Sequence, residues 1–334
     1  MQLADTLNPE LIYPEYIYIT SISPGLVAHF AKYADHIIKR IRPRTGAWVV
    51  DIGSNDGTLL RHFKKRGMSV RGIDPAESIA RMATNSGIPT QCGFFGSRLA
   101  DEIRAVTIPA DIITANHIMA NVADLHDFAK GIKTLLADNG TFVFETGYWP
   151  AIRDRMLIDT IEHEHIHYFA VKPLAQFFQL HGLRLVAVEE QPTKGGSLRG
   201  YVRHLGSGQP DFDDSVEEFI AREDRMPNAP DWPRVHTPVK GAGEQWVGYG
   251  AAVGSTLLLH HYYGIGPMLT ELWDDNAGRH GLYSPGLHLP VKPPNSSNPD
   301  KIVILAWRYA EMIMAKHPEH QGKWIIPLPT LRYA

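Results

Sequence analysis

The densest group of proton-active residues in the chain lies in the segment Asp159–Tyr168. Soluble domains scatter such residues, because each one must be hydrogen-bonded or paired once it is buried. Carboxylates and imidazoles can move protons or bind a metal ion near neutral pH. The segment therefore predicts a functional site. Six consecutive positions of this segment, 162–167, hold two carboxylates and three imidazoles, namely Glu162, His163, Glu164, His165 and His167.

The residues alone leave three interpretations of this segment open. In a metal site, His163, His165 and His167 would share one face of a strand and hold zinc or iron. In a proton-transfer site, His165 would be the base, and Glu164 would orient it, bind an acceptor hydroxyl or act as the base itself. In the third interpretation, the histidines are hydrogen-bonded polar residues at a domain boundary. A complete ligand set from one strand is geometrically awkward, so we expect no metal.

Composition restricts the class of protein. The chain has 334 residues, 44% of them hydrophobic, which is long enough for two domains with cores. A net charge of −3 gives no reason to expect nucleic acid or an anionic membrane as partner. The single cysteine, Cys92, excludes disulfides within the chain and a cysteine-based zinc knuckle. We see no membrane-spanning apolar run and no signal peptide, so we expect a cytoplasmic protein.

The elements that must position the site follow a strand–helix alternation. Repeated units of this kind require a parallel sheet with helices on both faces. Strands at 183–189 and 197–204 are expected to form its antiparallel edge. An extended, tyrosine-bearing arm and an amphipathic helix at 24–40 precede the sheet. The expected parallel strands are 48–52, 69–74, 110–115 and 140–145, and the expected helices are 58–66, 76–86, 125–136 and 173–181.

A second α/β unit is predicted from about Gln245. A strand, a glycine turn and the start of a helix occupy 246–256, and further strands are expected at 269–275 and 301–307. The glycine turn either binds a nucleotide or permits tight strand–helix packing. The fold class is therefore α/β with two Rossmann-like units. The expected parts are an N-terminal arm and helix (1–45), a first domain (46–205) and a second domain (206–334).

The loop Asp51–Gly57 follows a strand and opens a helix, which is where open α/β sheets bind ligands. It is not a full G-x-G-x-x-G fingerprint, so a pyrophosphate cofactor is not favoured. Asp51 and Asp56 would repel phosphates but suit a cationic ligand. Asp74, at the end of the next strand, fits an acceptor for two ribose hydroxyls. A positively charged nucleoside describes S-adenosylmethionine.

The expected cofactor site combines the ends of three strands. The alternative is a generic strand–helix turn in which Asp51 caps the helix. The predicted cofactor-binding residues are Asp51, Gly53, Ser54, Asn55, Asp56, Gly57, Asp74, Pro75, Asn116 and His117.

The chain resembles the sugar C-methyltransferases that act on nucleotide-linked keto-deoxysugars. The resemblance implies a class I (Rossmann-like) S-adenosylmethionine-dependent methyltransferase domain followed by a second Rossmann-like domain. It also implies a nucleotide-sugar as acceptor, in secondary-metabolite or polysaccharide biosynthesis. The segments that carry it span nearly the whole chain: Gln2–Asp5, Tyr16–Tyr18, Asp51–Gly57, Ala115–His117, Asp159–His165, Gly195–Ser197, Gly248–Ala251 and Tyr283–His288.

Three features differ from the family pattern. The chain begins past the position where the family's N-terminal four-cysteine zinc module would end. Glu162 stands where the family usually has tyrosine, and Val253 stands where a lysine is common. An ionised Glu162 would repel an enolate, so either it acts as the base or the acceptor is different.

The resemblance implies methylation of a carbon next to a ketone, through an enolate. His165 and Glu164 would then activate the acceptor, while Tyr16 or Tyr18 would donate to the enolate oxygen. Two other functions stay open: O-methylation or methylation of a non-sugar small molecule with the same cofactor, and non-catalytic binding on this fold. The predicted catalytic residues are His165, Glu164, Glu162, His163, Tyr16 and Tyr18.

Overall fold

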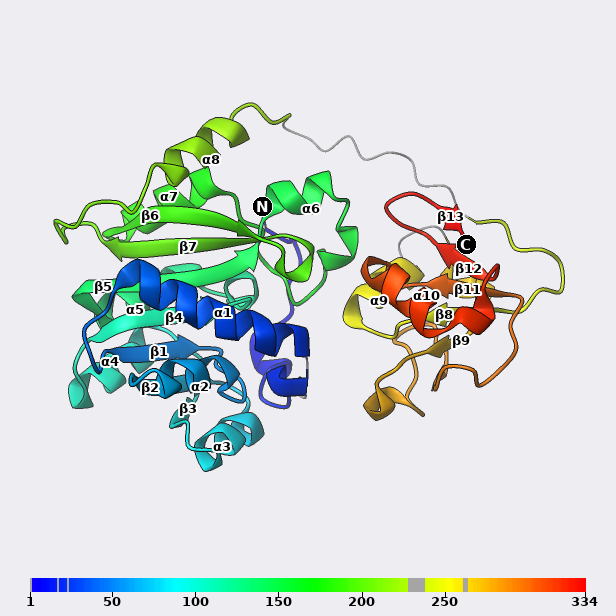
Figure 1. Ribbon diagram of the computed structural model, residues 1–334, viewed down its shortest axis with the longest axis horizontal. Helices are drawn as coiled ribbons and strands as arrows, with labels where there is room; N and C mark the ends of the chain where they lie inside the picture. The colour runs from blue at the N-terminus through cyan, green and yellow to red at the C-terminus, as the bar shows by residue number, and fades with distance from the viewer. Residues whose placement is uncertain (1, 17, 23, 228–237, 261–263) are drawn as a thin grey trace. The chain divides into compact units, whose positions relative to one another are not determined.

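A computed structural model describes residues 2–16, 18–22, 24–227, 238–260 and 264–334 (Figure 1). The chain forms two compact units, each of which is described by itself. The first contains residues 1–150 and 163–227, and the second contains residues 151–162 and 228–334. The expected domain limits at 45/46 and 205/206 stay predictions. No described helix is long and apolar enough to cross a membrane.

The first unit is built on a seven-stranded sheet in the order β3-β2-β1-β4-β5-β7-β6. Strands β1 to β5 are parallel, and β7 runs antiparallel to both of its neighbours. The expected parallel sheet and its antiparallel edge are both confirmed. The strands are β1 (Trp48–Ile52), β2 (Ser69–Asp74), β3 (Thr90–Cys92), β4 (Ala110–Asn116), β5 (Leu136–Gly147), β6 (Leu183–Gln191) and β7 (Ser197–His204).

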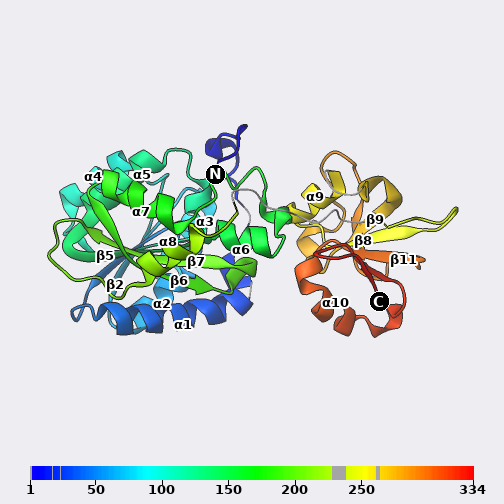
Figure 2. The ribbon, with the colours of Figure 1, turned by 90° about the horizontal axis from the view of Figure 1, so that it is seen from above.

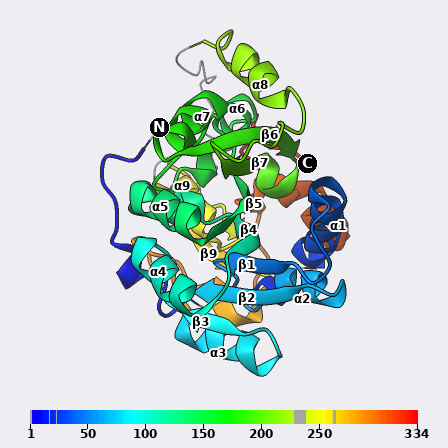
Figure 3. The ribbon, with the colours of Figure 1, turned by 90° about the vertical axis from the view of Figure 1, so that its left-hand side faces the viewer.

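Helices cover both faces of this sheet, with α4 and α5 on one side and α1 and α2 on the other (Figures 2 and 3). Because both faces are covered, every residue of β1 is buried, which explains its continuous apolar pattern. The sequence analysis did not predict β3 or α4. The helices are α1 (Pro24–Ile41), α2 (Thr58–Lys65), α3 (Glu77–Asn85), α4 (Ser97–Val106), α5 (Leu125–Leu135), α7 (Val171–Leu180) and α8 (Ser215–Glu223).

Helix α1 packs its apolar stripe onto the sheet. Phe30 and Ile37 are buried in the core beneath it, and Ile38 and Ile41 pack against the edge of that core. Leu26, which also belongs to the predicted stripe, instead lines a pocket. The preceding arm is not simply extended, because it contains two short 3₁₀ turns, η1 (Pro9–Leu11) and η2 (Thr20–Ile22).

The second unit contains a six-stranded sheet in the order β10-β9-β8-β11-β12-β13. All of its pairs are parallel except β12–β13. The predicted second α/β unit is confirmed. Its strands are β8 (Trp246–Tyr249), β9 (Leu269–Trp273), β10 (Val291–Lys292), β11 (Lys301–Ile304), β12 (Trp324–Ile326) and β13 (Arg332–Tyr333), and its helices are α9 (Val253–His260) and α10 (Ala310–Lys316). Helix α6 (Trp149–Asp154) spans the point where the chain leaves the first unit.

Candidate cofactor and acceptor site

A pocket of about 500 Å³ opens in the first unit where β1, β2 and β4 end. Its walls also include residues of the N-terminal arm, helix α1 and the turn between β6 and β7. Six of the predicted cofactor-binding residues line it: Gly53, Asn55, Asp74, Pro75, Asn116 and His117. The position agrees with the rule that open α/β sheets bind ligands beyond the carboxyl ends of their strands.

Gly53 keeps the floor of the pocket open. Its φ of 70° lies in the left-handed region. A Cβ added there would lie 2.5 Å from Cγ2 of Ile118, another pocket residue. Both the backbone conformation and the close approach therefore require glycine at this position.

Asp74 presents a buried carboxylate that only backbone groups of the described residues bind. Its Oδ2 accepts the backbone N–H of Asn55 over 2.8 Å, and its Oδ1 accepts that of Ala76 over 3.0 Å. Burial raises the pKa of Asp74, and the two N–H donors lower it. Each carboxylate oxygen has a second lone pair, so Asp74 can also accept hydroxyl donors from a ligand in the pocket.

Asn116, at the end of β4, carries the strongest sign of a missing ligand. Both amide atoms of its side chain, Oδ1 and Nδ2, are buried and have no hydrogen-bond partner among the described residues. Leaving a buried polar group unpaired costs about 1–3 kcal/mol. The side chain lines the pocket, so a polar ligand there would satisfy it.

His117 follows with a left-handed backbone, at φ 57°, and its N–H donates to the carbonyl oxygen of Glu145 over 2.7 Å. Burial, together with the nearby charge of Lys194, lowers the pKa of His117 to about 3, against the opposing effect of Glu145. The imidazole is therefore neutral at physiological pH.

Four predicted cofactor residues, namely Asp51, Ser54, Asp56 and Gly57, do not belong to the pocket lining. Asp51 is buried and accepts the Thr114 hydroxyl over 2.6 Å, and burial raises its pKa to about 7. Ser54 packs against β2, because a Cβ added to Gly72 of that strand would lie 2.3 Å from the Oγ of Ser54.

Asp56, rather than Asp51, is the acid that caps the start of helix α2, from the position before the N-cap residue Gly57. Its Oδ1 accepts the backbone N–H of Thr58 over 3.1 Å and the Thr58 hydroxyl over 2.6 Å. Its Oδ2 accepts the N–H of Ser21 over 3.3 Å and lies 3.3 Å from Arg61. The alternative interpretation of a capped strand–helix turn therefore describes part of this loop, with a different residue as the cap.

The N-terminal arm forms one wall of the pocket through Tyr13, Tyr16 and Tyr18. Asn55 fixes it to the cofactor loop, because its Oδ1 accepts the N–H of Thr20 over 2.8 Å and its Nδ2 donates to the Tyr18 carbonyl over 2.9 Å. Tyr13 is held by Asn121, whose Nδ2 lies 2.6 Å from its hydroxyl.

The arm also reaches the proton-active segment. The backbone N–H of Leu3 donates to the carbonyl of Ile166 over 2.9 Å. The Tyr16 hydroxyl donates to Oε2 of Glu164 over 3.4 Å. Two predicted catalytic residues from opposite ends of the first unit's sequence are thus brought together, with Tyr16 in the pocket wall.

The other members of the segment lie in different surroundings. His165 is half-buried, and its charge is among the influences that lower the pKa of His117, after burial and Lys194. His163 is exposed, and Glu162 groups with the second compact unit.

The segment is not a strand, which was the premise of the metal interpretation. A 3₁₀ turn, η4 (Ile158–Thr160), is followed by a bend and turn at 162–164. The Nε2 of His167 lies 3.0 Å from the Val122 carbonyl oxygen. Among the described residues, no group of three histidine, cysteine or carboxylate side chains could hold a metal ion.

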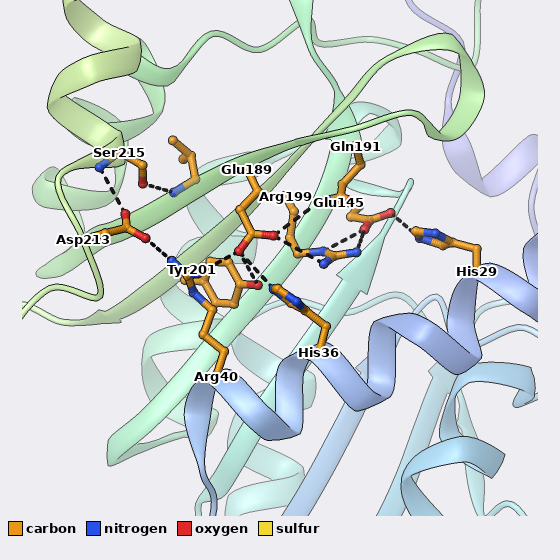
Figure 4. A network of polar contacts seen from close by, with 11 residues as sticks. His29, His36, Arg40, Glu145, Glu189, Gln191, Arg199, Tyr201, Asp213 and Ser215 are labelled. Carbon is orange, nitrogen blue, oxygen red and sulfur yellow. Dashed lines mark hydrogen bonds and ion pairs between the residues drawn. The ribbon is translucent and has the colours of Figure 1, made fainter.

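A buried polar network that the sequence analysis missed lies beside the pocket, between α1 and the β5–β7 edge (Figure 4). Glu145, at the end of β5, accepts Nε of Arg199 over 2.8 Å, and its other oxygen lies 2.9 Å from Nε2 of His29. His117 is 3.6 Å away. Burial opposes the charge of Glu145, but His29 and Arg199 hold its pKa at about 2.

The same network continues toward the surface. Glu189 lies 3.5 Å from Arg199, 3.0 Å from His36 and 3.1 Å from Arg40, as Figure 4 shows. Arg40 also pairs with Asp213. The signal in the sequence was a charged residue inside each of two predicted strands, at 145 and 199, because such a charge requires a partner once it is buried.

Comparisons with known proteins agree with this geometry. Residues 27–188 match a family model described as a methyltransferase domain, and residues 234–329 match one described as a C-methyltransferase C-terminal domain. The chain is 28% identical, over 355 residues, to the C-methyltransferase NovU of Streptomyces niveus, with 99% of this chain and 84% of that protein covered.

Solved methyltransferase structures are similar to about half of the chain. An S-adenosylmethionine-dependent methyltransferase from Clostridium acetobutylicum ATCC 824 is 10% identical, with a TM-score of 0.42 over 54% of this chain and 92% of that one. Magnesium protoporphyrin IX methyltransferase from Synechocystis PCC 6803, solved with bound SAH, is 15% identical, with a TM-score of 0.41 over 54% of this chain and 84% of that one.

Proposed function

Since the chain is an S-adenosylmethionine-dependent methyltransferase and is similar to C-methyltransferases, we propose that it methylates the carbon next to the ketone of a nucleotide-linked keto sugar. One observation carries the proposal. The Tyr16 hydroxyl in the pocket wall binds Glu164 of the proton-active segment, which supplies an acid–base pair beside the cofactor loop.

The residues present fit the cofactor. Asp74 would accept the two ribose hydroxyls, the unpaired amide of Asn116 would bind a polar group of the methionine part, and Gly53 leaves room for the backbone approach. When bound, the cofactor supplies an electrophilic methyl group on a sulfonium. The arm tyrosines and the buried Phe30 in the pocket wall exclude water from that group.

The acceptor carbon must lose a proton before it can attack. We assign this step to His165, because imidazole titrates near physiological pH and this side chain lies within electrostatic reach of the pocket residue His117. The Tyr16 hydroxyl has one proton, which it donates to Glu164 in this structure, and we infer that it turns to donate to the ketone oxygen as negative charge develops there. Neutral His117 does not compete for the proton.

A second candidate, O-methylation of a hydroxyl acceptor, is favoured by one feature. Glu162 replaces the tyrosine of the family pattern, and a carboxylate suits a hydroxyl acceptor better than an enolate. Tyr18, in the pocket wall, and exposed His163 have no assigned step in either reaction and remain candidates from the sequence.

Three measurements test the proposal in sequence. Calorimetry should show S-adenosylmethionine binding at tens of micromolar or tighter, and no binding refutes it. A panel of nucleotide-linked keto sugars and hydroxylated controls, screened for a mass gain of one methyl, identifies the acceptor. Solvent deuterium should enter the carbon next to the ketone, since only carbanion chemistry requires that exchange.

A variant pair then tests the base. His165→Ala should retain cofactor binding and lose turnover by about 10²–10⁴-fold. His62→Ala, on α2 and outside the pocket lining, is the matched control and should keep both. Equal turnover of His165→Ala and the wild type would remove His165 from the mechanism.

A further inference from the structure

Lys194 has a strained backbone conformation in the turn between β6 and β7. Its φ of 50° and ψ of 28° are left-handed, in the 3₁₀ turn η5 (Thr193–Gly195). For a residue with a Cβ this conformation costs about 1–2 kcal/mol. The neighbours Gly195 and Gly196 show that glycine is tolerated in this turn, at φ 87° and 146°. Keeping a lysine at the strained position indicates a use for its side chain.

The side chain of Lys194 lines the pocket together with Asn116 and His117. Of the described residues that form this lining, Lys194 is the one with a lysine or arginine side chain. The lining carboxylates are Glu10, Asp74, Asp124 and Asp127. A lysine that faces this many acids is well placed for an anion that forms within the pocket, because the acids alone would repel it.

His117 connects Lys194 to the proposed base. After burial, the charge of Lys194 is the largest influence that lowers the pKa of His117, and His165 acts on the same imidazole in the same direction. Lys194 and His165 therefore both act electrostatically on one residue of the pocket lining.

From the place of Lys194 in the pocket lining, beside Asn116 and His117, we propose that Lys194 is a catalytic residue whose ammonium stabilises the enolate oxygen of the acceptor. The inference rests on the proposed function. His165 takes the proton from the carbon next to the ketone, the C–H electron pair forms the carbon–carbon double bond, and the ketone π pair moves to oxygen beside Lys194. The double-bond pair then forms the new C–CH₃ bond while the methyl–sulfur bond breaks, its electron pair stays on sulfur, and the ketone re-forms. Lys194 keeps its proton throughout.

Kinetics of Lys194→Met test the role, with Lys130→Met on the exposed face of α5 as the matched control. The assay uses the nucleotide-linked keto sugar that the wild type methylates. Removing one oxyanion donor should lower kcat by about 10²-fold and the deuterium exchange rate in parallel, while KM and cofactor affinity change less than about threefold. Lys194→Arg should recover part of kcat, and Lys130→Met should behave as the wild type.

Other outcomes overturn the assignment. An increase in KM with kcat unchanged would mean that Lys194 binds a phosphate of the ground-state acceptor. Unchanged kcat and exchange would mean that the side chain has no part in the reaction. A wild type that neither methylates nor exchanges any keto sugar would instead refute the proposed function itself.

A titration that needs no turnover checks the location of the charge. The pKa of His117, followed by NMR of the imidazole, should rise in Lys194→Met because a nearby positive charge has been removed. It should stay at its wild-type value in Lys130→Met. A His117 pKa that is equal in all three proteins would place the ammonium outside the pocket and overturn the proposal.

Discussion

Acidic residues at the strand ends of the two units differ in their partners. In the second unit, three carboxylates lie on or just after β9, and each has a basic partner. Lys292 lies 2.6 Å from Glu271, Arg279 lies 2.9 Å from Asp274, and Lys316 lies 2.5 Å from Asp275. In the first unit, Asp51 and Asp74 receive only a hydroxyl and backbone N–H groups from the described residues.

The likeness between Asp74 and Asp274 makes the contrast sharper. Asp74 is the last residue of β2, and Asp274 directly follows β9, the corresponding strand of the second unit. Both accept a loop N–H, from Asn55 in one case and from Ala251 over 2.7 Å in the other. Both also accept the N–H of the residue two positions later. Only Asp274 adds an arginine among the described residues.

The glycines of the second loop serve packing. A Cβ on Gly250 would lie 2.8 Å from the Cβ of Ala306, and one on Gly248 would lie 2.7 Å from Leu272. The combination of a strand, a glycine loop and an acidic residue therefore occurs in both units and does not by itself indicate a ligand site. Uncompensated carboxylates beside an unpaired amide are what mark a ligand site.

The largest test concerns Glu145, a fully buried carboxylate of the first unit that has an arginine partner. Arg199→Met leaves the fully buried Glu145 without its arginine, which should cost about 3–5 kcal/mol of unfolding free energy. Lys292→Met, in the second unit, removes the half-exposed partner of Glu271 and should cost less than about 1 kcal/mol. Urea unfolding followed by circular dichroism measures both.

Equal losses in Arg199→Met and Lys292→Met would contradict the contrast between a fully buried pair and a pair whose lysine is half-exposed. A double variant, Glu145→Gln with Arg199→Met, provides the control. It should be more stable than Arg199→Met alone, because no unpaired charge is left in the interior.

The sequence predicted the first sheet well because strand–helix alternation and apolar runs are local properties. It also placed Asp74 and Asn116 at strand ends, and both residues line the pocket. It did not predict the short β3, whose three residues carry too little pattern.

Partners far apart in the chain could not be predicted in this way. The contact of Tyr16 with Glu164 joins residues 148 positions apart, and the pairing of Glu145 with Arg199 depends on β7 lying next to β5. The role of Asp56 as the cap was missed because two aspartates flank the same turn, and only the geometry distinguishes them.

A second test uses pH, because Asp51 is buried without a charged partner among the described residues. Burial raises its pKa to about 7, from about 3.9 in an unfolded chain. Between these values the folded state keeps a proton that the unfolded state has lost, so stability falls as pH rises, by about 1.4 kcal/mol per pH unit. Asp51→Asn has no such titration. Its unfolding free energy relative to that of the wild type should therefore increase by about 2–3 kcal/mol from pH 5 to pH 7.

Urea midpoints at the two pH values measure this gain, and Asp56→Asn is the matched control. Burial opposes the charge of Asp56, but hydrogen bonds from Ser21 and Thr58 lower its pKa. It is therefore ionised in both states over this range, and its difference from the wild type should stay constant. A difference for Asp51→Asn that is the same at pH 5 and pH 7 would show that this carboxyl is not perturbed.

A third test compares the two matching aspartates directly. Asp74→Asn should weaken S-adenosylmethionine binding by about 30-fold, since it replaces a charged acceptor of ligand hydroxyls with a neutral amide. Asp274→Asn should leave the affinity within about twofold of the wild type. Calorimetry measures both. Comparable losses would mean that the second glycine loop also takes part in cofactor binding.

The smallest expected effect distinguishes Asp74, which lines the pocket, from Asp56, which stabilises the start of α2. Asp56→Ala removes the cap of α2 and should cost about 1 kcal/mol of unfolding free energy, because the N–H of Thr58 loses its acceptor. Cofactor affinity should stay within about threefold of the wild type, since Asp56 does not belong to the pocket lining. Thermal unfolding and calorimetry on the same preparation give the two values. An affinity loss as large as that of Asp74→Asn would return Asp56 to the cofactor site, as the sequence predicted.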